Sequence, residues 1–176
     1  MTKKEIIEQL QANHVSFTSM ILLLSEADFL FSIDNKWTPG EQAEHILRSI
    51  KPVNLAFSLP HFFLKTLFGK STRPSKTFDA LVQKYKEKLA AGGRASGRFI
   101  PKPVAFKNKE KVSTSILAVN EGICKKVNKC SEKELDTYLL PHPLLGKLTL
   151  REMLYFNIHH VEHHKKSVED LLKRNL

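Results

Sequence analysis

The chain has 176 residues, of which 41% are hydrophobic and 26% are charged. These values predict one globular domain over residues 1–176 with a core of its own. The chain has two cysteines, Cys124 and Cys130, which form no C-x-x-C motif and are too few for a disulfide framework. The formal net charge of +10 would suit a polyanion partner, but scattered lysines without an aromatic-interleaved basic motif favour a solvated basic surface over nucleic-acid binding.

The N-terminal segment predicts a first helix. Thr2 is a suitable N-cap, Glu5 completes a capping box, and apolar residues recur at helical spacing over residues 6–24. A break is expected at residues 25–28 and a turn at residues 34–36. No apolar signal-peptide core is present at the start, and the cysteines are expected to be inert thiols, so a cytoplasmic location is predicted.

A strong helix start follows the turn. Thr38 as N-cap, Pro39 at the first helical position and Glu41 three residues after the cap predict it. Pro52 is expected to kink or end this helix, which makes residues 53–68 either its bent continuation or a separate helix. That stretch is the most apolar of the chain. It is too short to cross a bilayer, and a buried core helix is favoured over one that lies on a membrane surface.

The rest of the chain predicts three more helices joined by linkers. The helices are expected at about residues 77–91, 109–128 and 149–173, and the linkers at residues 69–75, 91–103 and 139–146. Thr149 and Glu152 form a further capping box at the start of the last helix. No strand-type alternation is found, so the fold is predicted to be all-α. Four or five long helices with one long connection fit a four-helix bundle with a short extra helix or a kinked second helix.

The last predicted helix carries half of the eight histidines, within residues 159–164. Because four residues make about one helical turn, His160 and His164 share one face, while His159 and His163 share a neighbouring one. A heptad-like seam that is apolar at both ends runs through Met153, Asn157, His160, His164, Val168 and Leu171. The seam predicts that His160 and His164 point into the bundle and that the other pair lies at its flank.

The second predicted helix carries a matching polar stripe, formed by Gln42, His45, Ser49 and Pro52. Two buried polar stripes that face each other can satisfy their groups by hydrogen bonds or by sharing a metal ion. His45, His160 and His164 would offer three neutral imidazoles and leave coordination positions open, as in catalytic metal sites. Two plainer interpretations remain open: a solvated helix rich in histidine and lysine, and a His45 that is only hydrogen-bonded.

Two motifs resemble a known family. Residues 37–46 resemble the second-helix signature of the DinB/YfiT-like superfamily. Residues 142–149, followed by residues 160–164, resemble its C-terminal signature, in the DinB-like branch with an H-P-x-x-G-x-L-T lead into the last helix. The resemblance covers almost the whole chain, with both motifs in the right order. One departure is Ser167, which lies where many members have a nearby glutamine.

The resemblance implies a four-helix bundle with up-down-down-up topology. It also implies a divalent metal ion held by one histidine of the second helix and the H-x-x-x-H pair of the last, which here are His45, His160 and His164. Zinc or nickel is the expected ion, and three imidazoles would also suit iron or copper. Glu41, Glu44 and Glu162 are candidates to orient a ligand imidazole, although Glu44 and Glu162 point elsewhere on their helices and fit surface charge better.

The function expected from the resemblance is that of a metal-dependent hydrolase or thiol S-transferase. It would act on a small-molecule substrate, with a low-molecular-weight thiol as co-substrate if the reaction is transfer, and relatives often form homodimers. Two alternatives remain. One is a non-catalytic metal-binding stress or damage-response protein with a small, occluded cavity, and the other is a basic helical bundle that binds nucleic acid or a membrane surface.

Overall fold

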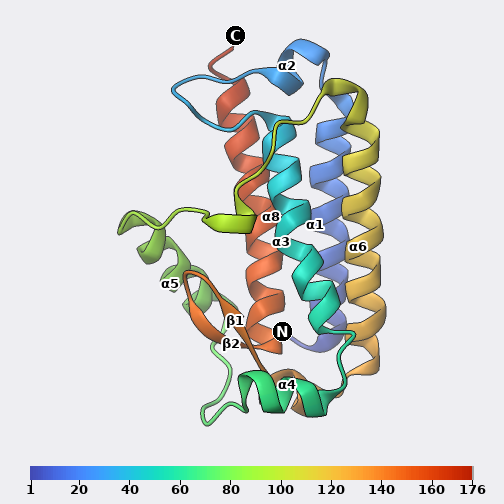
Figure 1. Ribbon diagram of the computed structural model, residues 1–176, viewed down its shortest axis with the longest axis vertical. Coiled ribbons are helices and arrows are strands. Elements are labelled where there is room, and N and C mark those ends of the chain that lie inside the picture. Colours follow the sequence, from blue (N-terminus) through green and yellow to red (C-terminus); the bar gives the residue numbers. More distant parts are fainter. Residues whose placement is uncertain (176) are drawn as a thin grey trace.

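The computed structural model describes residues 1–175, and Leu176, the last residue of the predicted domain, lies outside that part. The elements in chain order are α1 (Lys3–Leu23), α2 (Glu26–Leu30), α3 (Pro39–Ala56), α4 (His61–Phe68), α5 (Phe78–Ala90), η1 (Gly97–Phe99), η2 (Phe106–Asn108), α6 (Lys109–Lys129), α7 (Glu132–Thr137), β1 (Leu139–His142), β2 (Gly146–Thr149) and α8 (Leu150–Leu172). The long helices α1, α3, α6 and α8 form a bundle (Figure 1).

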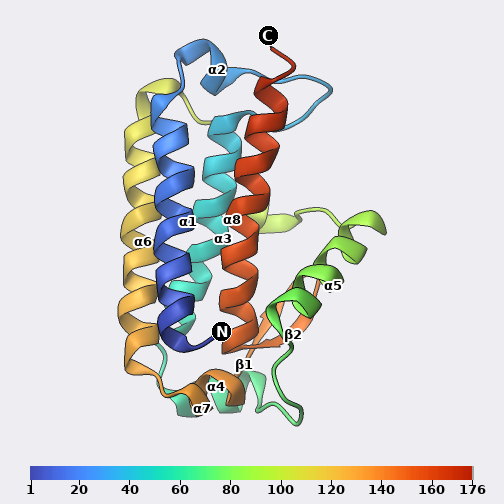
Figure 2. The ribbon, with the colours of Figure 1, turned by 180° about the vertical axis from the view of Figure 1, so that it is seen from behind.

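The bundle has the predicted up-down-down-up topology. In Figures 1 and 2, α1 runs upward, α3 and α6 run downward, and α8 runs upward again. Helices α1 and α3 each pack against both α6 and α8, so α1 lies diagonally opposite α3 and α6 lies diagonally opposite α8. Because α3 and α6 point the same way, the chain between them returns along the whole bundle, and this crossover contains α4, α5, η1 and η2.

The starts of the long helices follow the predicted capping chemistry. Thr2, Thr38 and Thr149 each accept a hydrogen bond from the backbone N–H of the glutamate three residues later, and each glutamate caps in return. Pro52 lies inside α3, which continues beyond it to Ala56, and α4 is a separate helix. The sequence left open whether residues 53–68 continue the second predicted helix or form a separate one. The structure has a separate helix over His61–Phe68, after α3 has ended at Ala56.

The prediction of a buried core helix over residues 53–68 is wrong. Leu64 is buried, but Phe62, Phe63 and Leu67 on α4 are 70%, 50% and 61% exposed. Helix α4 lies across the foot of the bundle and packs against β1 (Figure 1), so only one of its faces meets the rest of the protein. Apolar composition alone could not reveal that the neighbouring Pro60 starts a new helix outside the bundle core.

The fold is mostly helical, as predicted, but it includes one short hairpin that the sequence pattern did not reveal. β1 and β2 form an antiparallel hairpin in which Leu140 pairs with Leu148, and both side chains are buried. Each strand has four residues, which is too short for an alternating pattern to stand out, and Pro141 obscures the first strand. The short helices α2 and α7, each capped by a serine, were likewise not predicted.

A buried carboxylate fixes the crossover to the start of α8. Glu152 is fully buried and accepts two hydrogen bonds from the guanidinium of Arg73, at 2.6 and 2.9 Å. It also accepts from the backbone N–H groups of Lys76 and Thr149. If the start of the last helix moved away from the crossover, the buried carboxylate of Glu152 would lose these partners and leave an uncompensated charge. The pairing therefore fixes the position of the last helix.

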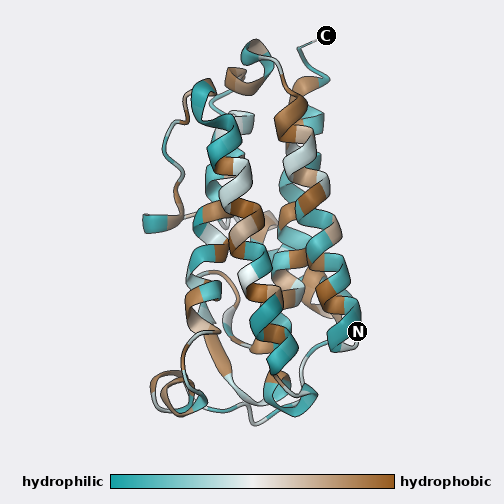
Figure 3. Cartoon of the chain, turned by 90° about the vertical axis from the view of Figure 1, so that its right-hand side faces the viewer, coloured by the Kyte–Doolittle hydropathy of each residue, from teal (hydrophilic) through white to brown (hydrophobic). Residues whose placement is uncertain are grey.

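The long helices carry alternating hydrophilic and hydrophobic segments along their length (Figure 3). Their apolar residues face the bundle core, as expected for amphipathic helices that pack together. Within residues 1–175, no helix combines the length and the apolarity needed to cross a membrane.

Candidate metal centre

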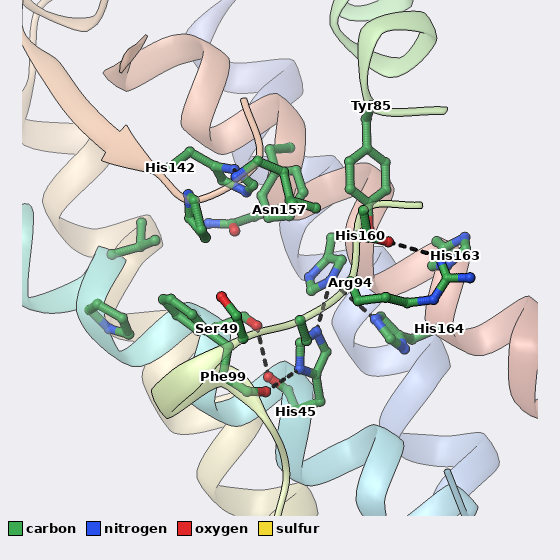
Figure 4. A pocket seen from close by; sticks show the side chains of 18 of the residues that line it. His45, Ser49, Tyr85, Arg94, Phe99, His142, Asn157, His160, His163 and His164 are labelled. Atoms are coloured by element: carbon green, nitrogen blue, oxygen red, sulfur yellow. Dashed lines mark hydrogen bonds between the residues drawn. The ribbon is translucent and has the colours of Figure 1, made fainter. Parts of the chain in front are cut away.

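Three histidines from two helices meet between α3 and α8. The Nε2 atom of His160 lies 3.2 Å from Nε2 of His45 and 3.0 Å from Nε2 of His164. All three side chains are buried, with exposed fractions of 4–6%. The sequence-predicted residues are therefore brought together, with their Nε2 atoms facing one another (Figure 4).

Hydrogen bonds at the other ring nitrogens fix the tautomers of two of these rings. His45 Nδ1 donates to the backbone carbonyl of Phe99, at 2.7 Å, and His164 Nδ1 donates to the side-chain oxygen of Gln42. A neutral imidazole carries one proton, so Nε2 of both rings presents a lone pair. His160 can supply a proton to one of these lone pairs but not to both. Three nitrogens in this arrangement are best satisfied by a shared cation.

Burial keeps the three imidazoles neutral. It lowers the pKa of His45 and places the pKa of His160 and His164 well below the ordinary value, and the neighbouring histidines add to the effect. Neutral imidazole is the form that binds metal ions. For zinc–nitrogen bonds of about 2.0–2.1 Å in a tetrahedral site, nitrogen atoms lie roughly 3.3 Å apart. The two observed separations are close to that value, so the donor set fits a divalent metal ion.

Aromatic side chains hold the three rings in place. The indole of Trp37 packs against His45 and His164, with ring centroids 4.9 and 6.3 Å apart. Phe156 stacks on His160 at 4.6 Å, and Tyr85 meets the same ring edge-on. These contacts limit rotation of the three imidazole rings.

The acceptors that orient the ligand rings differ from the carboxylates considered in the sequence. Glu41 caps the start of α3, Glu44 pairs with Arg48, and Glu162 is exposed. Gln42 and the carbonyl of Phe99 occupy the orienting positions instead. Gln42 lies on the polar stripe that the spacing revealed, whereas a backbone carbonyl from a distant loop leaves no signal in the sequence.

The second histidine pair stays outside the cluster, as its helical position predicts. His159 and His163 lie at the flank of α8, where both rings meet the edge of Tyr85 at centroid distances of 5.9 and 6.0 Å. Burial lowers the pKa of His159 to about 4. Ser167, the departure from the resembled signature, donates its hydroxyl to the backbone carbonyl of His163 and lines the cavity beside the cluster.

That cavity has a volume of about 840 Å³ and opens between the bundle and the crossover. Basic side chains lie at its wall and apolar side chains cover much of the remainder, among them Lys36, Arg94, Arg98, Phe68, Leu89, Leu140, Leu144 and Met153. Cys124 and Cys130 are buried elsewhere as free thiols, and burial raises the pKa of Cys124 to about 11. Both cysteines therefore fit the prediction of inert thiols.

Comparison with known proteins gives the family. A model described as the DinB superfamily matches residues 9–168. The chain belongs to the DinB superfamily. The crystal structure of TT2238, described as a four-helix bundle protein, is similar over 96% of this chain and 99% of its own, with a TM-score of 0.58 and 16% identity. At that identity the similarity of this DinB-superfamily chain to TT2238 concerns the fold alone. No curated protein matches the chain.

Proposed function

We propose that this DinB-superfamily protein is a divalent-metal-dependent enzyme, either a hydrolase or a thiol S-transferase. His45, His160 and His164 would hold zinc or nickel. The observation that carries the proposal is the convergence of three buried Nε2 atoms, two of which present lone pairs because Nδ1 of the same ring donates to a fixed oxygen. Membership of the superfamily and the adjoining cavity support the same function.

The chemistry would depend on the charge of the bound ion. Such an ion lowers the pKa of a bound water or thiol, which supplies a nucleophile near neutral pH. Because the three imidazoles are neutral, they would leave its positive charge uncompensated. Gln42 and the carbonyl of Phe99 orient two of the ligand rings, and such partners usually raise ligand basicity. Arg94 and Arg98 at the cavity wall add positive potential, which favours an anionic or strongly polar substrate.

The size of the cavity favours an enzyme over a non-catalytic metal-binding protein. Small-molecule sites usually have volumes of about 300–1,000 Å³, and the cavity of about 840 Å³ falls in that range. An occluded, small cavity would have suited the alternative. Neither cysteine lines the cavity, so a reacting thiol would come from a small co-substrate of the cell.

The first test is the metal content of protein purified without a histidine tag and then incubated with zinc or nickel. We expect about one ion per chain in the wild type and almost none in a His160→Ala/His164→Ala variant. A His159→Ala/His163→Ala variant is the matched control, because it removes the same number of histidines from the same helix and should keep the ion. A wild type that takes up neither metal would overturn the proposal, and so would a control that loses it.

The reaction class is tested next on the metal-loaded protein. Thiol transfer to an electrophile and ester or amide hydrolysis should be screened in parallel, with the double variant as the blank. Turnover that depends on a low-molecular-weight thiol would identify a transferase, and turnover without a thiol would identify a hydrolase. Metal binding without any turnover would instead favour the non-catalytic stress protein.

A further inference from the structure

One polar side chain at the cavity wall has no partner. Asn157 lies one turn before His160 on α8 and is 2% exposed, and it lines the cavity. Among the described residues, neither its amide nitrogen nor its amide oxygen finds a hydrogen-bond partner. A buried amide without partners is unfavourable, and most buried polar groups are paired. This amide therefore offers its NH2 group as a donor and its oxygen as an acceptor to a molecule in the cavity.

A second polar group is held at the same wall. His142, at the end of β1, accepts hydrogen bonds at Nδ1 from the backbone N–H groups of Leu144 and Leu145, at 3.2 and 3.1 Å. The proton of the neutral ring is therefore on Nε2. Burial, with a smaller effect of the Lys84 charge, lowers the pKa of His142 to about 4, so the ring stays neutral at physiological pH.

The two groups belong to one wall of the cavity. The His142 ring packs on Phe156 at a centroid distance of 4.2 Å, and Phe156 in turn stacks on His160 at 4.6 Å. Asn157 is the next residue of the same helix, and Figure 4 shows His142 and Asn157 together to one side of the three-histidine cluster. Within residues 1–175, no acceptor is found for the Nε2–H of His142. The wall thus presents two donor groups, the Nε2–H of His142 and the NH2 of Asn157, and one acceptor, the Asn157 oxygen, close to the candidate metal centre.

We propose that Asn157 and His142 bind an amide group of the substrate beside the metal. The proposal rests on the proposed function, since it assigns a substrate group to the cavity of that enzyme. The ligand carbonyl would accept from the Nε2–H of His142 and from the amide N–H of Asn157, while the ligand N–H would donate to the Asn157 oxygen. A carboxylate or an ester has no N–H, so it would leave that oxygen unpaired. The apolar lining residues would contact the rest of the molecule.

The test uses a matched pair of probes, 4-phenylbutanamide and its ester analogue methyl 4-phenylbutanoate. Their dissociation constants would be measured by NMR titration on the zinc-loaded and the metal-free protein. We expect the amide to bind about tenfold more tightly than the ester, because the ester leaves one buried acceptor unpaired. In an Asn157→Leu variant, which keeps the side-chain size, the preference should disappear through weaker binding of the amide. An Asn120→Leu variant alters a buried asparagine between α1 and α6 and should keep the preference.

A third variant tests the histidine. His142→Phe keeps an aromatic ring against Phe156 but removes the Nε2–H, so it should weaken both probes several-fold, because both contain the carbonyl. Equal affinity of the two probes for the wild type, no binding of the amide, or an unchanged preference in Asn157→Leu would each overturn the proposal. Zinc content measured on the same samples separates the two proposals. Amide preference in a protein that takes up no metal would overturn the metalloenzyme alone, and one zinc per chain without amide preference would overturn the amide site alone.

Discussion

Two parts of the bundle bury histidine, and they use it differently. Between α1 and α6, His14 is fully buried, and its Nδ1 donates to the carbonyl of Leu10 one turn earlier in its own helix, at 2.8 Å. The amide of Asn120 donates to the same carbonyl, at 3.1 Å. Nε2 of His14 has no partner among the described residues. This side of the bundle therefore contains one imidazole that points at no other ligand.

Between α3 and α8, by contrast, the anchors come from other elements. The carbonyl of Phe99 in the crossover holds His45, and Gln42 of α3 holds His164 on α8. When the Nδ1 acceptor lies on a different element, it can turn the imidazole ring toward the other histidines. When the acceptor is a carbonyl in the preceding turn, as for His14, the ring stays against its own helix. Burial is therefore common to both regions, and the position of the Nδ1 acceptor distinguishes the candidate ligands His45 and His164 from His14.

The largest expected difference between the two regions concerns metal affinity. His45→Ala should reduce bound zinc from about one ion per chain to almost none, because two imidazoles on one helix remain. His14→Leu removes an equally buried histidine and should bind zinc like the wild type. Competition with a chromophoric chelator measures both. Loss of zinc in His14→Leu comparable to that in His45→Ala would contradict the distinction drawn between the two regions.

Removing an anchor should have a smaller effect than removing a ligand. Gln42→Leu leaves the three imidazoles in place but frees Nδ1 of His164, and we expect zinc affinity to fall about 10- to 100-fold. Glu44→Gln is the control, because Glu44 pairs with Arg48 and not with a ligand ring. The same chelator competition applies. Equal losses in both variants would mean that the orienting bond has no specific effect.

Acid should destabilise the α1–α6 region through His14. Burial lowers the pKa of His14 from 6.5 to about 4, so the unfolded chain binds a proton more readily than the folded one. The contribution of the neutral ring is present above pH 6.5 and is lost as the pH falls toward 4. At pH 5 the loss is about 2 kcal/mol relative to pH 8.

Urea unfolding of metal-free wild type and His14→Leu at pH 8 and pH 5 measures that loss. The other buried histidines titrate in both proteins, so the difference between the two isolates His14. The variant should lose about 2 kcal/mol less free energy of unfolding on acidification. An identical pH dependence in the two proteins would show that His14 does not cause the acid sensitivity.

The smallest expected effect is that of Asn120→Leu. The substitution removes one hydrogen bond to Leu10 but also removes an amide oxygen that has no partner in the described part of the chain. These changes oppose each other, so the free energy of unfolding should change by less than about 1 kcal/mol. Zinc affinity should not change. Thermal unfolding with the chelator assay measures both, and a large loss of stability would indicate a bridging water at this amide.

The features that the sequence could predict depend on residues that lie near one another along the chain. The capping boxes at Thr38 and Thr149 and the seam through His160 depend on residues within a few turns of each other, and the structure has both helices and the buried seam as expected. The exposure of α4, the hairpin and the carbonyl of Phe99 depend on where distant segments pack. No residue type reports that packing, so these features could not be read from the sequence.

The centre also joins parts of the chain that are far apart. His45 and Phe99 are separated by 54 residues, and His45 and His160 by 115. Contacts of such long range form slowly, because a large loop must close before they contribute. During synthesis, the first half of the chain emerges with one of the three imidazoles, and the other two follow only with α8. If the protein binds a metal ion as proposed, uptake would follow the synthesis of α8, and a bound ion would report that α3 and α8 have packed together.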